Sequence, residues 1–196
     1  MPSGLHRYQQ GGGLHFITFS CYHRLKNLDT PAARDLFENA LETVRERYRL
    51  AVLAYVAMPE HVHLLLNEPA RGNLAKTIQA LKLSVAVRSA ERPFWQARYH
   101  DGNIRDEKAC SEVIRYIHRN PVARGLVRRP EDWPWSSFRH YATGERGTVE
   151  IESFWTAWKR KNETLVPVRS STPPASVIPG SQQRGPGARK YRREDG

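Results

Sequence analysis

Four stretches of the chain carry the aromatic, β-branched and alternating residues that predict β-strands. The first is LHFITFSCY at residues 14–22. Two short apolar runs at 50–57 and 61–67 are split by the letters MPE, which is the pattern of an antiparallel pair joined by a tight turn. The segment 94–106, FWQARYHDGNIRD, predicts a fourth strand or a strand-like loop, with a turn at its Gly-Asn pair.

Three other stretches repeat apolar residues every three or four positions, which is the period of a helix packed on a core. Thr30 is placed to cap the first of them, which has a proline at its first helical position. Asn73 caps the second helix, and Asp106 caps the third, EKACSEVIRYIHRN. We expect the third helix to stop near Asn120, because Pro121 disfavours helical geometry in the residue before it.

The predicted order of elements is strand, helix, strand, strand, helix, strand, helix. This order fits an α+β ferredoxin-like fold, a split βαβ sandwich with an antiparallel sheet and helices on one face, plus an added C-terminal helix. We expect this domain to span residues 1–158. Residues 159–196 hold nine Lys or Arg, three acidic residues and five prolines, with almost no apolar periodicity. That composition predicts a disordered basic tail.

The charge balance of the chain indicates its partner. Lysine and arginine total 31 against 20 acidic residues, a net charge of +11, which favours a polyanion and above all nucleic acid. No stretch approaches the length of a membrane-spanning helix, and MPSGLHRYQQGGG lacks an apolar signal-peptide core. We therefore expect a cytoplasmic protein with no membrane partner. Cys21 and Cys110 are too few for a disulfide framework or a Cys-rich zinc site.

Two histidines lie one residue apart in the third predicted strand. Because strand side chains alternate between faces, His61 and His63 point the same way and can share one metal ion. The same pair also fits the solvated face of a hairpin, and a metal would need at least one further ligand. On the third helix, Tyr116 and Asn120 are four apart and share a polar face. They also fit a rim tyrosine and a residue that closes the helix before proline.

The order of three motifs closely resembles one known family. MPEHVHLLL is followed by VIRYIHRNPVARGLV and then by RPEDWPWSSFRHY, as in the REP-associated tyrosine transposases and their single-strand insertion-sequence relatives, which are HUH endonucleases. The likeness runs from about Gly4 to Trp158. It implies that His61 and His63 bind a divalent metal, that Tyr116 is the nucleophile, and that Asn120 completes the metal site.

The resemblance also implies a reaction and its partners. The enzyme would cleave and rejoin single-stranded or hairpin DNA in transposition, through a 5'-phosphotyrosine, as a monomer or a homodimer. Imidazoles alone would suit Zn, Ni or Cu, whereas phosphoryl transfer in this family implies Mg or Mn. Glu60 is expected to be a turn residue whose side chain faces away from the histidines. The basic residues expected to contact DNA are Lys76, Lys82, Arg88, Arg98, Arg105, Arg115 and Arg119.

Several aromatic residues receive separate predictions. Phe94, Trp95 and Tyr99 are available to stack on unpaired bases, whereas the aromatic residues of EDWPWSSF are expected to pack back on the core. Two other functions fit the same residues. One is a non-catalytic single-stranded nucleic-acid binder that stacks bases on strand aromatics such as Phe16 and Phe19. The other is a zinc hydrolase that uses activated water and would not need Tyr116.

Overall fold

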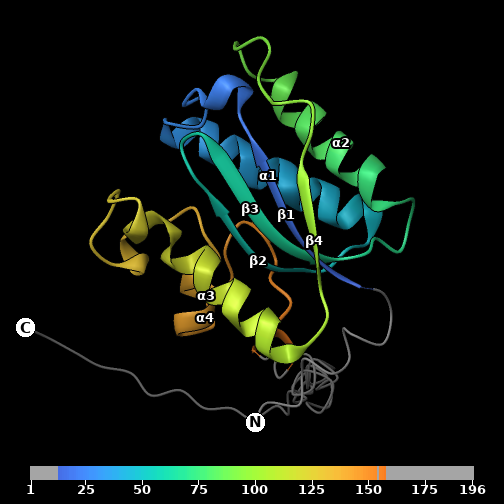
Figure 1. Ribbon diagram of the computed structural model, residues 1–196, viewed down its shortest axis with the longest axis vertical. Coiled ribbons are helices and arrows are strands. Elements are labelled where there is room, and N and C mark those ends of the chain that lie inside the picture. The colour runs from blue at the N-terminus through green and yellow to red at the C-terminus, as the bar shows by residue number, and fades with distance from the viewer. Residues whose placement is uncertain (1–12, 154, 158–196) are drawn as a thin grey trace, which may run out of the picture. The chain divides into compact units, whose positions relative to one another are not determined.

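The computed structural model describes residues 13–153 and 155–157 (Figure 1). The strands are β1 (Leu14–Ser20), β2 (Val52–Ala57), β3 (His61–Asn67) and β4 (His100–Ile104). The helices are α1 (Pro31–Tyr48), α2 (Leu74–Ala86), α3 (Glu107–Ala123) and α4 (Phe138–Thr143), with short 3-10 turns η2 (Tyr22–Arg24) and η3 (Pro130–Asp132). The predicted tail at 159–196 lies outside the described residues.

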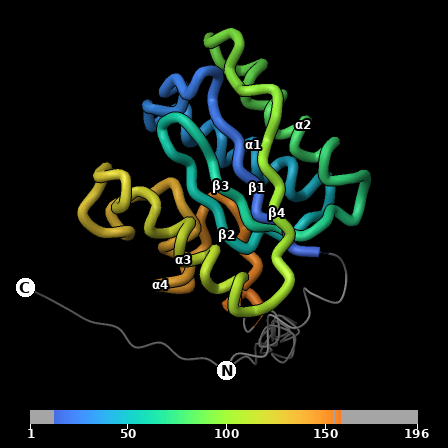
Figure 2. The backbone as a smooth tube through the Cα atoms, viewed as in Figure 1, coloured from blue at the N-terminus to red at the C-terminus, as the bar shows by residue number. Residues whose placement is uncertain are grey.

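The four strands form one antiparallel sheet in the order β2-β3-β1-β4. Figure 2 shows β3 and β1 in the middle of the sheet, with β2 and β4 at its edges. Strands β1 and β2 are joined through α1 with β3 inserted between them, which is the split βαβ arrangement. The predicted α+β ferredoxin-like fold is confirmed.

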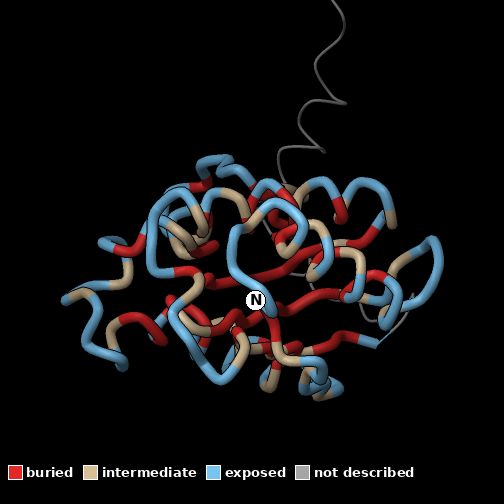
Figure 3. The backbone as a smooth tube through the Cα atoms, turned by 90° about the horizontal axis from the view of Figure 1, so that it is seen from above, coloured by how far each residue is buried: buried red, intermediate tan, exposed pale blue. Residues whose placement is uncertain are grey.

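Alternation along the strands gives the sheet two buried faces, and each face packs on different helices. Val62, Leu64 and Leu66 of β3 belong to the core that α1 and α2 cover. Leu65 points the other way, into a second core with Ile117 of α3. The sheet is therefore the middle of three layers, with α1 and α2 on one side and α3 on the other (Figure 1). Figure 3 shows the buried positions gathered in this middle layer.

The predicted caps hold the helix starts. The side chains of Thr30, Asn73 and Asp106 each accept a hydrogen bond from the backbone N–H three residues later, at 3.2, 2.9 and 2.8 Å. Each cap satisfies a backbone donor that the first turn of a helix leaves unpaired. The three helices therefore begin where the sequence predicts.

The predicted end of the third helix is wrong. Helix α3 continues through Pro121 to Ala123. Pro121 lies in the last turn, so the missing amide costs only the bond to the carbonyl four residues earlier. The backbone N–H of Leu126 then bonds to the Pro121 carbonyl at 3.0 Å and closes the turn. Asn120 is therefore a residue inside the helix and does not terminate it.

The predicted turn at Gly102 and Asn103 is also wrong. Both residues lie inside β4, opposite Phe16 and His15 of β1 in a continuous antiparallel register. Pairing with β1 satisfies the backbone of this polar segment, and that gain overrides the local turn preference of the Gly-Asn pair. Strand β4 is an edge strand with one open side, which explains its polar composition.

The segment after α3 packs back on the sheet, as predicted for its aromatic residues. The indole nitrogen of Trp133 donates to the Ala57 carbonyl at 3.1 Å, and that of Trp135 donates to Asp35 at 2.7 Å. The guanidinium of Arg34 lies 3.9 Å from the Trp135 ring centroid. These contacts hold the chain between α3 and α4 against β2 and α1.

Candidate active site

The two histidines of β3 lie side by side on the face that α3 covers. His61 and His63 are only 5% and 4% exposed, and their Nε2 atoms are 3.0 Å apart. The alternative of a solvated hairpin face is therefore excluded, because β3 is a central strand and the helix covers this side. The two ring nitrogens therefore face each other at a distance at which one ion could contact both.

The Nδ1 atoms of both rings lie within hydrogen-bond distance of neighbouring oxygens. Thr18, which lies opposite His63 in the β1–β3 register, places its Oγ1 2.8 Å from His63 Nδ1. Glu60 places Oε1 3.1 Å from His61 Nδ1. If each Nδ1 donates its proton to these acceptors, the Nε2 lone pairs of both rings face each other. In that state neither Nε2 atom carries a proton, and both lone pairs are available to one cation.

Glu60 differs from its prediction, because its carboxylate faces the site. Its Oε1 accepts from Arg124 at 2.5 Å and lies 3.5 Å from Arg24 as well as contacting His61. Burial alone would raise the pKa of Glu60, but His61 and Arg124 outweigh it and hold this pKa below its usual value. The carboxylate is therefore ionised and links the end of α3 to the first histidine.

Asn120 completes the cluster from α3. Its side-chain Nδ2 lies 3.2 Å from His63 Nε2, and its Oδ1 is buried without a hydrogen-bond partner among the described residues. A buried polar atom with no partner is costly, and a cation would satisfy it. No group of three His, Cys, Asp or Glu in the described part of the chain could hold a metal, so an amide is the available third ligand.

The electrostatics of the pair favour neutral imidazoles. Burial lowers the pKa of His61, and burial together with the nearby His61 ring lowers that of His63 to about 3. Neutral imidazole is the form that binds a metal ion. The donor set of two imidazole nitrogens and one amide oxygen therefore fits a divalent cation.

Tyr116 lies one helical turn before Asn120 and remains open to solvent. Its side chain is 51% exposed, with ring centroids 5.2 Å from His63 and 5.9 Å from Phe16. These edge contacts fix the ring beside the histidines and leave the phenol accessible to a large substrate. The structure thus brings together the four predicted residues, His61, His63, Tyr116 and Asn120, from β3 and α3.

The basic residues predicted to contact DNA are spread over several surfaces. Arg115 and Arg119 are exposed on α3, close in sequence to Tyr116. Lys82 of α2 is half-buried and donates to the carbonyls of Gln96 and Ala97 at 2.5 and 2.9 Å. The other four do not line the histidine cluster: Lys76 and Arg88 are on the α2 side, and Arg98 and Arg105 are around β4. The DNA contacts of all seven residues stay predictions.

Two aromatic predictions are wrong. Phe94 and Trp95 are 2% and 8% exposed and belong to the core under α1 and α2, so neither ring is available to stack on a base. Their burial follows from an isolated bridge between Cys21 and Trp95, which continues the sheet beyond β1. Thr18, Glu60 and Arg124 are the site residues that the sequence did not indicate.

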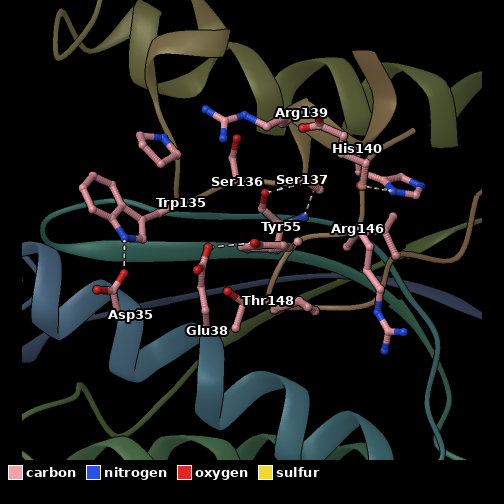
Figure 4. Close-up of a pocket in the computed structure, with 15 residues that line it drawn as sticks. Asp35, Glu38, Tyr55, Trp135, Ser136, Ser137, Arg139, His140, Arg146 and Thr148 are labelled. Atoms are coloured by element: carbon pink, nitrogen blue, oxygen red, sulfur yellow. Dashed lines mark hydrogen bonds between the residues drawn. The ribbon is translucent and has the colours of Figure 1, made fainter. Parts of the chain in front are cut away.

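A separate cavity of about 300 Å³ lies between α1, β2 and the segment before and after α4 (Figure 4). Glu38 and Tyr55 point into it and share a 2.7 Å hydrogen bond, with the phenol donating. Burial raises the pKa of Glu38 to about 7. None of the predicted site residues lines this cavity, and the tyrosine here is buried on the opposite face of the sheet.

Residues 10–120 match the family of IS200-like transposases, and the chain belongs to that family. It is a transposase, an enzyme that cleaves and rejoins DNA, as the motifs predicted. The chain is 31% identical over 149 residues to a REP-associated tyrosine transposase of Haemophilus influenzae, covering 68% of this chain and 84% of that protein. It is 29% identical over 133 residues to the REP-associated tyrosine transposase of Escherichia coli, covering 67% and 80%.

A solved structure of a REP-associated tyrosine transposase bound to a REP hairpin has the same fold. The TM-score is 0.61 at 25% identity, over 73% of this chain and 87% of that one. In the described part of the present chain, no helix combines the length and the apolar character needed to cross a membrane.

Proposed function

We propose that this transposase cleaves and rejoins single-stranded DNA with Tyr116 as the nucleophile and a divalent metal held beside it. One observation carries the proposal: the Nε2 atoms of His61 and His63 lie 3.0 Å apart beside the side-chain amide of Asn120, whose oxygen is buried and unpaired, one helical turn from an exposed tyrosine.

The phenol of Tyr116 suits a reversible strand break. Its oxygen forms a bond to phosphorus, the bond from phosphorus to the 3' oxygen breaks, and the phenolic proton leaves as the 3' oxygen gains one. The products are a 5'-phosphotyrosine and a free 3'-OH. A phenol ionises more readily than a serine hydroxyl and departs more readily later, so an incoming 3'-OH can reverse the step.

The residues that would hold the metal are His61, His63 and Asn120. A bound Mg or Mn ion would polarise the phosphoryl oxygens and stabilise the charge that develops on the leaving 3' oxygen. Because these three ligands are neutral, they leave the full charge of the ion available to the phosphate. Thr18 and Glu60 fix the ring orientations, and Phe16 and His63 hold the ring of Tyr116 beside the cluster.

Single-stranded or hairpin DNA is the proposed partner. The net charge of +11 favours a polyanion, and the similar solved transposase is bound to a hairpin. Histidines, amide and tyrosine all come from one chain, so we propose that a monomer is sufficient for the chemistry.

The test uses purified protein with 5'-labelled and 3'-labelled single strands taken from the flanks of its own gene. A covalent adduct on Tyr116 that requires Mg or Mn and disappears with EDTA is expected. Tyr116→Phe should abolish the adduct and retain DNA binding. Cleavage without an adduct would indicate water as the nucleophile, and binding without cleavage on a verified target would indicate a non-catalytic DNA binder.

A further inference from the structure

A second feature of α3 lies on a different flank of the helix from the histidine cluster. A groove of about 650 Å³ runs between α3 and the segment from residue 128 to 138. Four arginines line it, Arg115 and Arg119 from the helix and Arg128 and Arg129 from the segment that follows. We call this feature the arginine groove.

The arginine groove combines unneutralised charge with apolar surface. Arg129 is paired with Asp132 at 3.2 Å and Glu131 at 3.6 Å. Arg115, Arg119 and Arg128 have no ion pair within the described residues. The lining of the groove also includes the apolar side chains of Ile114, Val122 and Phe138. Several unpaired guanidiniums around one groove give it a positive potential, so the groove is suited to a ligand that carries several negative charges.

The position of the groove relative to Tyr116 indicates which polyanion would bind there. At about 100° per residue, Arg119 lies on the helix between the direction of Tyr116 and that of Val122, which lines the groove. A strand whose phosphate is at Tyr116 therefore meets Arg119 next and can continue into the groove without leaving the surface of α3.

We propose that the arginine groove binds the unpaired DNA strand next to the phosphate that Tyr116 attacks, with phosphates on the guanidiniums and a base on the apolar lining. This inference rests on the proposed function. Arginine pairs with phosphate oxygens, and apolar side chains accept the face of an unstacked base. A duplex keeps its base faces stacked inside, so it would leave Ile114 and Val122 uncovered.

The proposed contacts between the arginines and DNA phosphates are tested by the salt dependence of DNA binding. The probe is an oligonucleotide hairpin with unpaired thymidine flanks, and the protein carries Tyr116→Phe in EDTA so that no chemistry occurs. Each phosphate contact to a single strand contributes about 0.7 to the slope of log affinity against log salt. Adding Arg115→Gln and Arg128→Gln should lower that slope by about 1.4.

The matched control removes two arginines elsewhere. Arg47→Gln with Arg71→Gln changes the net charge equally, at exposed positions in α1 and before α2. The control should lower the slope by clearly less than the groove variant. Equal slopes for the two variants would overturn the inference. Absence of binding by the parent protein would also overturn the inference. The adduct assay tests the proposed function separately.

The position of the strand is tested by chemical protection. Ser111 is exposed and lines the groove, and Thr43 is exposed on α1. The native Cys21 and Cys110 are buried, so Ser111→Cys and Thr43→Cys each introduce one reactive thiol. The flanked hairpin should slow maleimide labelling at position 111 at least fivefold and leave position 43 unchanged.

The flanks of the oligonucleotide distinguish a single strand from a duplex. A blunt hairpin of the same stem, at a concentration that saturates the protein, should leave the thiol at position 111 reactive. Equal protection by the blunt hairpin would overturn the assignment to an unpaired strand. A thiol that stays reactive with both oligonucleotides bound would place the DNA elsewhere and overturn the whole inference.

Discussion

The side-chain amide of Asn120 lies 3.2 Å from Nε2 of His63, although the two residues are 57 positions apart and belong to elements on different layers. This contact joins the helix that carries Tyr116 to the strand that carries both histidines. The nearby Oδ1 of Asn120 has no partner among the described residues, which makes it the most informative atom of the site.

Replacing Asn120 by leucine should separate metal binding from folding. Without metal, the free energy of unfolding should change by less than about 1 kcal/mol, because removal of the unpaired buried oxygen offsets loss of the Nδ2 contact with His63. Affinity for Mn²⁺, followed by the loss of the free-ion EPR signal, should fall by roughly tenfold or more. Asn39→Leu, on the exposed face of α1, is the control for metal affinity. Unchanged Mn²⁺ affinity in Asn120→Leu would remove Asn120 from the ligand set.

Glu60→Gln should weaken the proposed metal binding without changing a proposed ligand. The glutamine still accepts from His61, but it loses the charge that pairs with Arg124 and favours the Nδ1–H form of the ring. Partners of this kind are worth roughly 10-fold to 100-fold in metal affinity. Calorimetric titration with Mn²⁺ measures the effect, with Glu131→Gln as the exposed control. An affinity equal to that of the parent protein would show that Glu60 serves the turn only.

Glu38→Gln should change the pH dependence of stability. Because the pKa of Glu38 is raised by burial from 4.5 to about 7, the folded state retains a proton that the unfolded state releases. Its contribution to stability is complete below pH 4.5 and is lost as the pH rises toward 7. The stability of the glutamine variant relative to the parent should therefore grow over this range, by up to about 3 kcal/mol.

Urea unfolding at several pH values gives the required difference. The exposed Glu46→Gln, on the same helix, should show no such growth between pH 4.5 and 7. A constant difference for Glu38→Gln would mean that the carboxylate is ionised in the folded state at neutral pH and that water or a cation reaches the cavity.

Both native thiols should resist modification in the folded protein. Burial is the main reason that the pKa of Cys21 is raised to about 12 and that of Cys110 to about 11. Thiolate is the reactive form, so labelling by iodoacetamide at pH 8 should be negligible until the protein is unfolded in guanidinium. Mass spectrometry of the two cysteine peptides measures this, and rapid labelling of either one in the native state would contradict its placement in the core.

The parts of the site that follow from local periodicity could be predicted from the sequence. The period of two in a strand placed His61 and His63 on one face, and the spacing of four in a helix placed Tyr116 beside Asn120. The helix starts could be predicted from their caps, Thr30, Asn73 and Asp106, because capping depends on a few adjacent residues. The motif order, rather than periodicity, connected the strand to the helix.

The remaining contacts depend on tertiary pairing. Thr18 meets His63 only because β1 and β3 pair in one register, and no local pattern in LHFITFSCY specifies that partner. Glu60 turns toward His61 because Arg124, at the far end of α3, and Arg24 both draw its carboxylate there. Pro121 does not end α3 because its position in the last turn makes its cost small.

The order of the elements along the chain has a consequence for synthesis. The sheet and both histidines are complete by Ile104, whereas Tyr116 and Asn120 arrive afterwards on α3 and reach the face that α1 and α2 leave open. A ribosome-bound chain that ends before α3 therefore has neither the proposed nucleophile nor the third metal ligand. The proposed strand-breaking activity would be switched on only when the last layer of the domain docks, so an unfinished copy would be harmless to the DNA around it.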